Sequence, residues 1–279
     1  MKYFIIKNFI SEENCQKLIQ DVEHFTNEGD FFKFHGNRSE LNSSNLAFNE
    51  LSLKSENWKN LTNKLNSNEF FNECCKRLGM DSSKLCIKNY FKLNSPTANQ
   101  KKYKKISNLK INLVPDKSLF KYLIYRIYRN LYRKIRFSKI FNINKKPLEV
   151  LYSYSRAGNG YLREIHRDSD NRLIVFLLYF NQLPKEAIGG TLDLYKLIKK
   201  DRNLATPEHN SCEKIVSIKP EAGKLLVFRN EEDSYHAVSC MENYNEFRHF
   251  VYGSFTLLSE KNPYIKNKSK LATDFHVYE

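Results

Sequence analysis

The sequence lacks the features that would place a chain in or across a membrane. It contains no run of about 18 apolar residues, which a spanning helix needs. Its apolar start, "MKYFIIKNFI", is interrupted by Lys7, has no small-residue cleavage site and runs into "SEEN". We therefore expect neither a transmembrane helix nor a secretory signal. The six cysteines show no CxxC pair and no framework spacing, so we expect reduced thiols in a cytoplasmic protein.

Acidic residues are nearly absent from one segment of the chain. Between Lys84 and Lys146 there are 18 Lys and Arg residues and one acid, Asp116, whereas the remaining sequence has 28 basic and 30 acidic residues. The net charge of +15 therefore originates in this segment. No repeat and no Gly/Ser-rich or Pro-rich linker divides the chain. We expect a single domain with an N-terminal strand and helices (1–83), a basic helical arm (84–146), a β-rich core (147–258) and a C-terminal tail (259–279).

The N-terminal segment predicts a short strand followed by capped helices. Ser11 precedes the amphipathic stretch "EENCQKLIQDVEHF", which has acids in its first turn, and is therefore a candidate N-cap. The stretches "SENWKNLTNKL" and "SNEFFNECCKRLG" repeat the same pattern of a serine followed by an amphipathic helix.

From Leu148 onward, short apolar runs alternate with turn residues, which is typical of strands. The expected strands lie near 149–155, 161–166, 172–180, 190–196, 213–218, 224–229, 235–240 and 247–258. Eight strands without intervening helices favour a double-sheet arrangement. The predicted fold is mainly β with flanking helices (α+β), and its core is a double-stranded β-helix of the jelly-roll or cupin-like kind.

His166 and Asp168 lie two residues apart just before the apolar stretch "RLIVFLLYFN". On a strand, residues i and i+2 point to the same face, so both side chains are expected in the mouth of the barrel. His236, in "SYHAVSC", lies at the start of the seventh expected strand. A chance HxD pair or a lone core histidine is common, but two imidazoles and one carboxylate on one face form the facial triad of non-haem iron sites.

Arg248 follows His236 by twelve residues, in "EFRHFVYGSF". A tight turn would return it on the adjacent strand to the depth of the metal, where its guanidinium suits bidentate capture of a carboxylate. The alternative is an ion pair with an acid such as Glu246 at the edge of a strand.

Several stretches in order resemble the Fe(II)- and 2-oxoglutarate-dependent oxygenases of the prolyl-4-hydroxylase-like group. They are "LYSYSRAGNGYLREIHRDSDNR", "FLLYFN", "GGTLDLY", "KPEAGKLLVF", "HAVSC" and "RHFVYGSF". The resemblance implies that Fe(II) is held by His166, Asp168 and His236, and that Arg248 binds the distal carboxylate of 2-oxoglutarate. It also implies that Tyr154 assists this carboxylate, with Tyr152 as the alternate on the same face.

The same resemblance implies a dioxygenase that uses Fe(II), 2-oxoglutarate and O2 to hydroxylate a C–H bond, with release of succinate and CO2. Its substrate is expected to be a small or conjugated molecule, and an anionic one if Arg163 and Arg172, which flank the ligand pair, contact it. Those arginines could equally form a solvated rim. The alternative function is a non-catalytic jelly-roll binding or scaffold module that docks to an anionic partner through residues 84–146.

The basic arm predicts one long helix near 118–139. Its apolar stripe comprises Phe120, Ile124, Ile127, Leu131 and Ile135, and its basic stripe comprises Arg126, Arg129, Arg133 and Arg136. Like charges along one helix face repel one another, which favours contact with an anion. The candidates are a phosphate-rich substrate, an acidic partner, nucleic acid or an anionic membrane surface. The alternative is a support helix whose basic face lies in water.

Overall fold

The computed structural model describes residues 1–34, 37–43, 45–87, 146–199, 205–257 and 262–265. Its N-terminal elements are β1 (Tyr3–Ile6), α1 (Glu12–Phe25), η1 (Glu28–Asp30), β2 (Phe32–Phe34), β3 (Arg38–Asn42), α2 (Leu46–Lys54), α3 (Glu56–Leu65), α4 (Asn68–Leu78) and β4 (Leu85–Ile87). The later elements are β5 (Lys146–Ala157), β6 (Arg163–His166), β7 (Arg172–Tyr179), β8 (Leu192–Leu197), η4 (His209–Ser211), β9 (Cys212–Ile218), β10 (Leu225–Arg229), β11 (Tyr235–Val238) and β12 (Arg248–Leu257).

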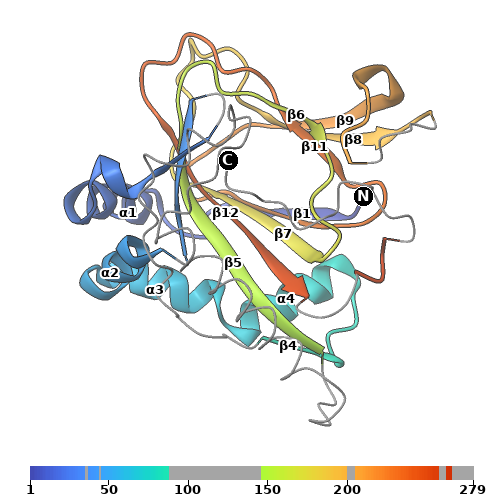
Figure 1. Ribbon diagram of the computed structural model, residues 1–279, viewed down its shortest axis with the longest axis horizontal. Coiled ribbons are helices and arrows are strands. Elements are labelled where there is room, and N and C mark those ends of the chain that lie inside the picture. The colour runs from blue at the N-terminus through green and yellow to red at the C-terminus, as the bar shows by residue number, and fades with distance from the viewer. Residues whose placement is uncertain (35–36, 44, 88–145, 200–204, 258–261, 266–279) are drawn as a thin grey trace, which may run out of the picture.

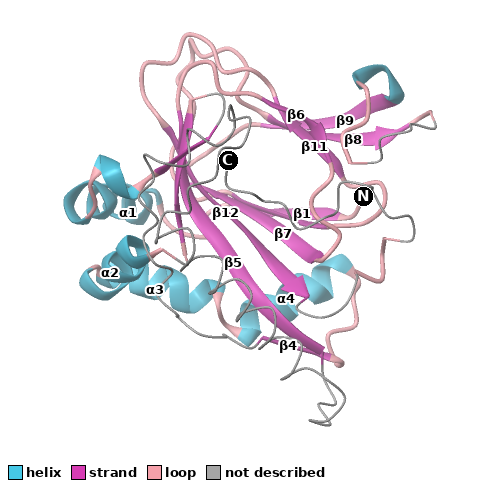
Figure 2. Cartoon of the chain, viewed as in Figure 1, coloured by secondary structure: helices cyan, strands magenta, loops and turns pink. Residues whose placement is uncertain are grey.

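The strands form two sheets that face each other. The large sheet has the order β1-β10-β7-β12-β5-β3-β2, with β4 paired to β5, and the small sheet has the order β6-β11-β8-β9. Helices α1 to α4 lie against the large sheet on the side away from the small sheet (Figures 1 and 2). The predicted double-sheet core with flanking helices is therefore confirmed.

Two apolar clusters separate the layers. Alternate residues of β7, such as Phe176 and Leu178, pack against helix residues that include Trp58. The residues between them, such as Val175 and Leu177, face the small sheet. Because β7 is buried on both faces, its sequence is continuously apolar instead of alternating.

Serine residues cap three of the four described α-helices, as the sequence predicts. Ser11, Ser55 and Ser67 each accept a hydrogen bond from a backbone N–H in the first turn of α1, α3 and α4. Helix α4 ends at Gly79, whose φ of 63° lies in the left-handed region that favours glycine. None of the helices in the described ranges is long and apolar enough to cross a membrane.

All eight strands expected after Leu148 are present, with ends within a few residues of the predicted ones. Strands β2, β3 and β4 were not expected from the sequence. They extend the large sheet through pairs with β5 or with each other. Most of the basic arm, including the helix predicted at 118–139, lies outside the described residues. All six cysteines are free thiols.

Candidate metal centre and co-substrate pocket

The small sheet brings the three predicted metal ligands together. His166 ends β6 and lies opposite His236 of β11 in the antiparallel pairing of these strands. Asp168 follows two residues later, beyond the end of β6, so the loop and not the strand pleat turns it toward the histidines. One ligand atom from each of the three residues lies within 4.8 Å of the others.

Backbone carbonyl groups fix the orientation of both imidazole rings. Nδ1 of His166 lies 2.8 Å from the carbonyl oxygen of Glu164, and Nδ1 of His236 lies 3.4 Å from that of Ser234. A carbonyl oxygen only accepts, so each Nδ1 carries the proton and each Nε2 keeps a lone pair for a metal. Burial lowers the pKa of both histidines, which favours the neutral form that binds metals.

The carboxylate of Asp168 has two distinct oxygens. Oδ1 accepts hydrogen bonds from Arg172 and Tyr252, at 2.7 and 2.6 Å. Oδ2 is buried, receives no hydrogen bond from any described residue, and lies 3.7 Å from Nε2 of His236. Burial raises the pKa of Asp168, but the charge of Arg172 and its hydrogen bond outweigh that effect, and the pKa falls to about 2. A buried anionic oxygen beside two neutral imidazoles fits Fe(II).

Arg248 lies deep between the sheets and is 1% exposed. Its Nη1 donates to the carbonyl oxygen of Gly190 at 2.6 Å, whereas its Nε is buried and has no hydrogen-bond partner among the residues that the structure describes. In the described part of the chain no acidic side chain pairs with it, and Glu246 is exposed, so the strand-edge ion pair is not what the structure shows. A buried and unneutralised guanidinium suits a carboxylate ligand.

Two tyrosines that the sequence analysis did not select lie beside Arg248. The guanidinium of Arg248 lies 5.4 Å from the ring centroid of Tyr161 and 6.0 Å from that of Tyr179. The hydroxyl of Tyr179 is buried and has no hydrogen-bond partner among the described residues. Burial raises its pKa to about 12, so the hydroxyl stays protonated and can donate. Tyr179 ends an apolar strand, where nothing in the sequence distinguishes it from a core aromatic residue.

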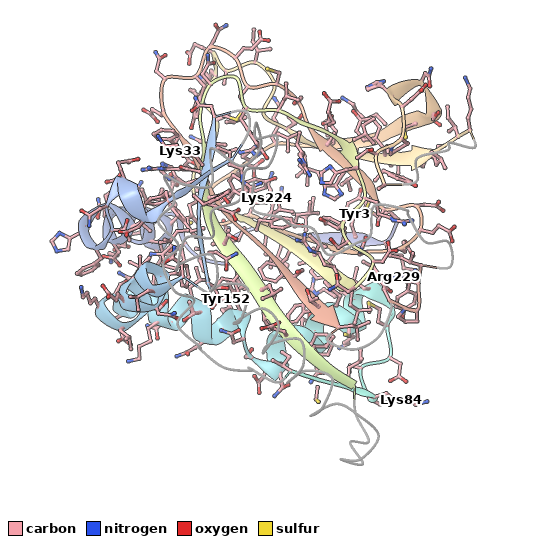
Figure 3. The ribbon with its side chains drawn as sticks, in the orientation of Figure 1. Tyr3, Lys33, Lys84, Tyr152, Lys224 and Arg229 are labelled. Carbon is pink, nitrogen blue, oxygen red and sulfur yellow. The ribbon has the colours of Figure 1, made fainter. Side chains whose placement is uncertain are left out.

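Tyr154 and Tyr152 belong to the apolar cluster on the helix side of the large sheet and not to the surroundings of Arg248, which corrects the role that the resemblance implied. Tyr154 bonds to Nδ1 of His249, and Tyr152 accepts a hydrogen bond from Asn66 of the helical layer. Figure 3 shows Tyr152 on the side of β5 that faces the helices. Ser155 and Ala157 of β5 face the small sheet instead, and Ser155 accepts a hydrogen bond from Arg38 of β3.

The two arginines that flank the ligand pair differ in their surroundings. Arg163 is exposed, and its charge lowers the pKa of both His166 and His236, which places it near the centre. Arg172 is not a rim residue, because its side chain is 14% exposed and pairs with Asp168.

The position of Arg248 also differs from the expected one. The strand that it begins, β12, belongs to the large sheet and is not adjacent to β11.

The family comparison agrees with this geometry. Residues 151–251 match the family model of the 2OG-Fe(II) oxygenase superfamily, and this range contains the histidine–aspartate–histidine group and Arg248. The chain carries a 2OG-Fe(II) oxygenase core. Oxygenases of this superfamily use Fe(II), 2-oxoglutarate and O2, for which the donor set and the basic pocket are suited.

The fold of this chain is similar to that of solved prolyl hydroxylases. A prolyl 4-hydroxylase from Phytophthora capsici has 14% identity and a TM-score of 0.51, with 94% of this chain and 60% of that chain covered. This chain therefore spans 60% of the length of that structure. A Pseudomonas putida prolyl-4-hydroxylase has 13% identity, a TM-score of 0.40 and 92% coverage of both chains.

A third similar structure is the viral collagen prolyl hydroxylase from Paramecium Bursaria Chlorella virus-1, described as a 2OG complex. It has 10% identity and a TM-score of 0.39, with 92% of this chain and 97% of that chain covered. The comparison with curated proteins gives no match.

Proposed function

We propose that this oxygenase hydroxylates a C–H bond of its substrate, while 2-oxoglutarate and O2 are consumed and succinate and CO2 are released. The observation that carries the proposal is the cluster of His166, Asp168 and His236, whose ligand atoms lie within 4.8 Å of one another. Fe(II) bound there would supply the activation of O2 that no amino-acid side chain provides. Three protein ligands leave positions open for a co-substrate.

The chain's own residues have separate tasks in this proposal. Nε2 of each histidine and Oδ2 of Asp168 bind the metal, and the buried guanidinium of Arg248 binds the distal carboxylate of 2-oxoglutarate. The hydroxyl of Tyr179 donates to the same carboxylate. The aromatic rings around Arg248, including Phe250 at 4.8 Å, exclude water and strengthen this charged contact.

The substrate is proposed to be anionic. Arg163 is exposed on β6, the strand that His166 ends, and the chain's excess positive charge lies in the basic arm. Positive charge around the mouth of a site raises the local concentration of an anionic substrate. The alternative of a non-catalytic scaffold is not favoured, because such a module has no use for a buried guanidinium that none of the described acidic residues neutralises.

Conversion of 2-oxoglutarate to succinate tests this proposal, with pooled metabolites and acidic conjugates as substrates. Arg248→Ala should weaken 2-oxoglutarate binding about 30-fold or more and leave Fe(II) affinity nearly unchanged, since losing a buried charged contact costs about 2–5 kcal/mol. Glu246→Ala removes an exposed acid near the same strand and serves as the control. An unchanged 2-oxoglutarate titration for Arg248→Ala would exclude this arginine from the co-substrate site.

A further inference from the structure

The two oxygens of Asp168 are presented differently, and two residues outside the ligand set cause the difference. Arg172 donates from Nη1 to Oδ1 at 2.7 Å, and the hydroxyl of Tyr252 donates to the same oxygen at 2.6 Å. No described residue donates to Oδ2, which is buried and faces His236. The hydrogen bonds therefore select one oxygen for the protein and leave the other for a ligand.

Arg172 and Tyr252 also support each other. Nη1 of Arg172 contacts the hydroxyl of Tyr252, and the guanidinium carbon lies 5.1 Å from the centroid of that ring. Arg172 begins β7 and Tyr252 lies on β12, which are neighbouring strands of the large sheet. Asp168 lies in the loop after β6 of the small sheet. The pair therefore connects the metal-binding loop to the opposite sheet.

The backbone of this loop is held independently of the two side chains. The fully buried amide of Asn230 donates to the carbonyl oxygens of Ser169 and Arg172, each at 3.0 Å. Asn262 donates to the carbonyl oxygen of Arg172 at 2.7 Å. Shortening the side chain of Arg172 therefore leaves the path of the loop in place, so the hydrogen bonds to Oδ1 have a purpose other than folding the loop.

We propose that Arg172 and Tyr252 are positioning residues that occupy Oδ1, so that Asp168 binds the metal through Oδ2 alone. A carboxylate that bound through both oxygens would fill one of the positions that the facial triad leaves open for co-substrate and O2. This inference rests on the proposed function, because it assigns a role around the same metal.

The test compares Tyr252→Phe and Arg172→Met with the parent. Removing a residue that hydrogen-bonds to a metal ligand typically lowers the metal affinity by about 10- to 100-fold. We expect Fe(II) affinity, measured by anaerobic titration, to fall about 10-fold for Tyr252→Phe and further for Arg172→Met. The visible charge-transfer band of the Fe(II)–2-oxoglutarate complex should shift in both variants, because the carboxylate donor changes. Thermal unfolding without metal reports whether each variant folds.

Tyr152→Phe is the matched control, since it removes a buried tyrosine hydroxyl on the opposite face of the large sheet. Its affinity and its band should equal those of the parent. Parent-like Fe(II) affinity and an unshifted band in Tyr252→Phe would overturn the inference, and this variant decides the question if Arg172→Met does not fold. A parent protein that binds neither Fe(II) nor 2-oxoglutarate would instead contradict the proposed function itself.

Discussion

Arg248 and Tyr179 place two buried hydrogen-bond donors in one apolar interior, and neither has an acceptor within the described part of the chain. Native proteins rarely leave such groups unsatisfied, because each costs about 1–3 kcal/mol when it is buried alone. A ligand that accepts from both removes this cost. The arrangement therefore favours a carboxylate over a neutral group at this position.

Replacing Tyr179 by Phe should weaken 2-oxoglutarate binding about 10-fold, since a hydrogen bond to a charged group contributes about 1.5–3 kcal/mol. Anaerobic calorimetric titration of the metal-loaded protein measures this affinity. Tyr154→Phe is the control, because its hydroxyl bonds to His249 on the helix-facing side of β5. If Tyr154→Phe lost affinity for 2-oxoglutarate and Tyr179→Phe did not, the co-substrate would contact Tyr154 and not Tyr179, contrary to this assignment.

His249 predicts a pH dependence of stability that is separate from the metal centre. Burial and the charge of Arg156 lower its pKa to about 4, whereas in the unfolded chain it titrates near 6.5. Between these values the unfolded state binds more protons, so the free energy of unfolding falls as the pH falls from 6.5 toward 4. When the pH is lowered from 7 to 5, the free energy of unfolding should fall by about 2 kcal/mol more in the parent than in the His249→Gln variant. Urea unfolding at both pH values measures the difference, and identical pH slopes would refute it.

Strand β12 depends on a close approach between a glycine and a neighbouring ring. It lies between β5 and β7, and a Cβ atom on Gly253 would overlap the ring of Phe176. Gly253→Ala should therefore destabilise the fold by about 1–3 kcal/mol. Gly29→Ala is the control, since no atom lies within 4 Å of a Cβ built there. Urea unfolding of both variants tests this, and equal stability would show that β12 can shift to make room.

The sequence predicts where the strands begin and end better than it predicts which layer each face of a strand contacts. Turn residues delimit the apolar runs, so all eight strands after Leu148 were located. Tyrosine and serine alternate along β5, but both of its faces are buried, so the pattern does not tell which face meets the helices and which meets the small sheet. Strand β3 is polar and forms by pairing with β5, which propensity does not reveal.

At the scale of the whole molecule, the clustering of His166, Asp168 and His236 could be predicted because these residues are close in sequence or lie on strands that the pattern located. The position of Arg248 could not be predicted in the same way, because the consecutive strands β11 and β12 belong to different sheets. Arg38, which lies beside Tyr161 in the interior, comes from more than a hundred residues before the metal ligands. No local pattern shows that such a residue enters the site, because tertiary packing alone places it there.

The uneven distribution of charge leads to a prediction for the whole chain. Changing the four arginines of the basic stripe, Arg126, Arg129, Arg133 and Arg136, to Gln should preserve folding and the binding of Fe(II) and 2-oxoglutarate, because Gln is nearly as good a helix former. Affinity for an anionic partner should fall, and in the parent it should weaken with added salt. Binding to anionic vesicles, heparin and oligonucleotides at two ionic strengths measures this. Equal binding by parent and variant would favour a support helix.

The metal centre is the central claim, and anaerobic Fe(II) titration of the double variant His166→Ala, His236→Ala tests it most directly. The parent should bind one Fe(II) per chain and develop a visible charge-transfer band when 2-oxoglutarate is added. The double variant should fold, show no such band and lose most of its Fe(II) affinity, because one carboxylate oxygen cannot hold the metal alone. A double variant that binds Fe(II) as the parent does would contradict the account.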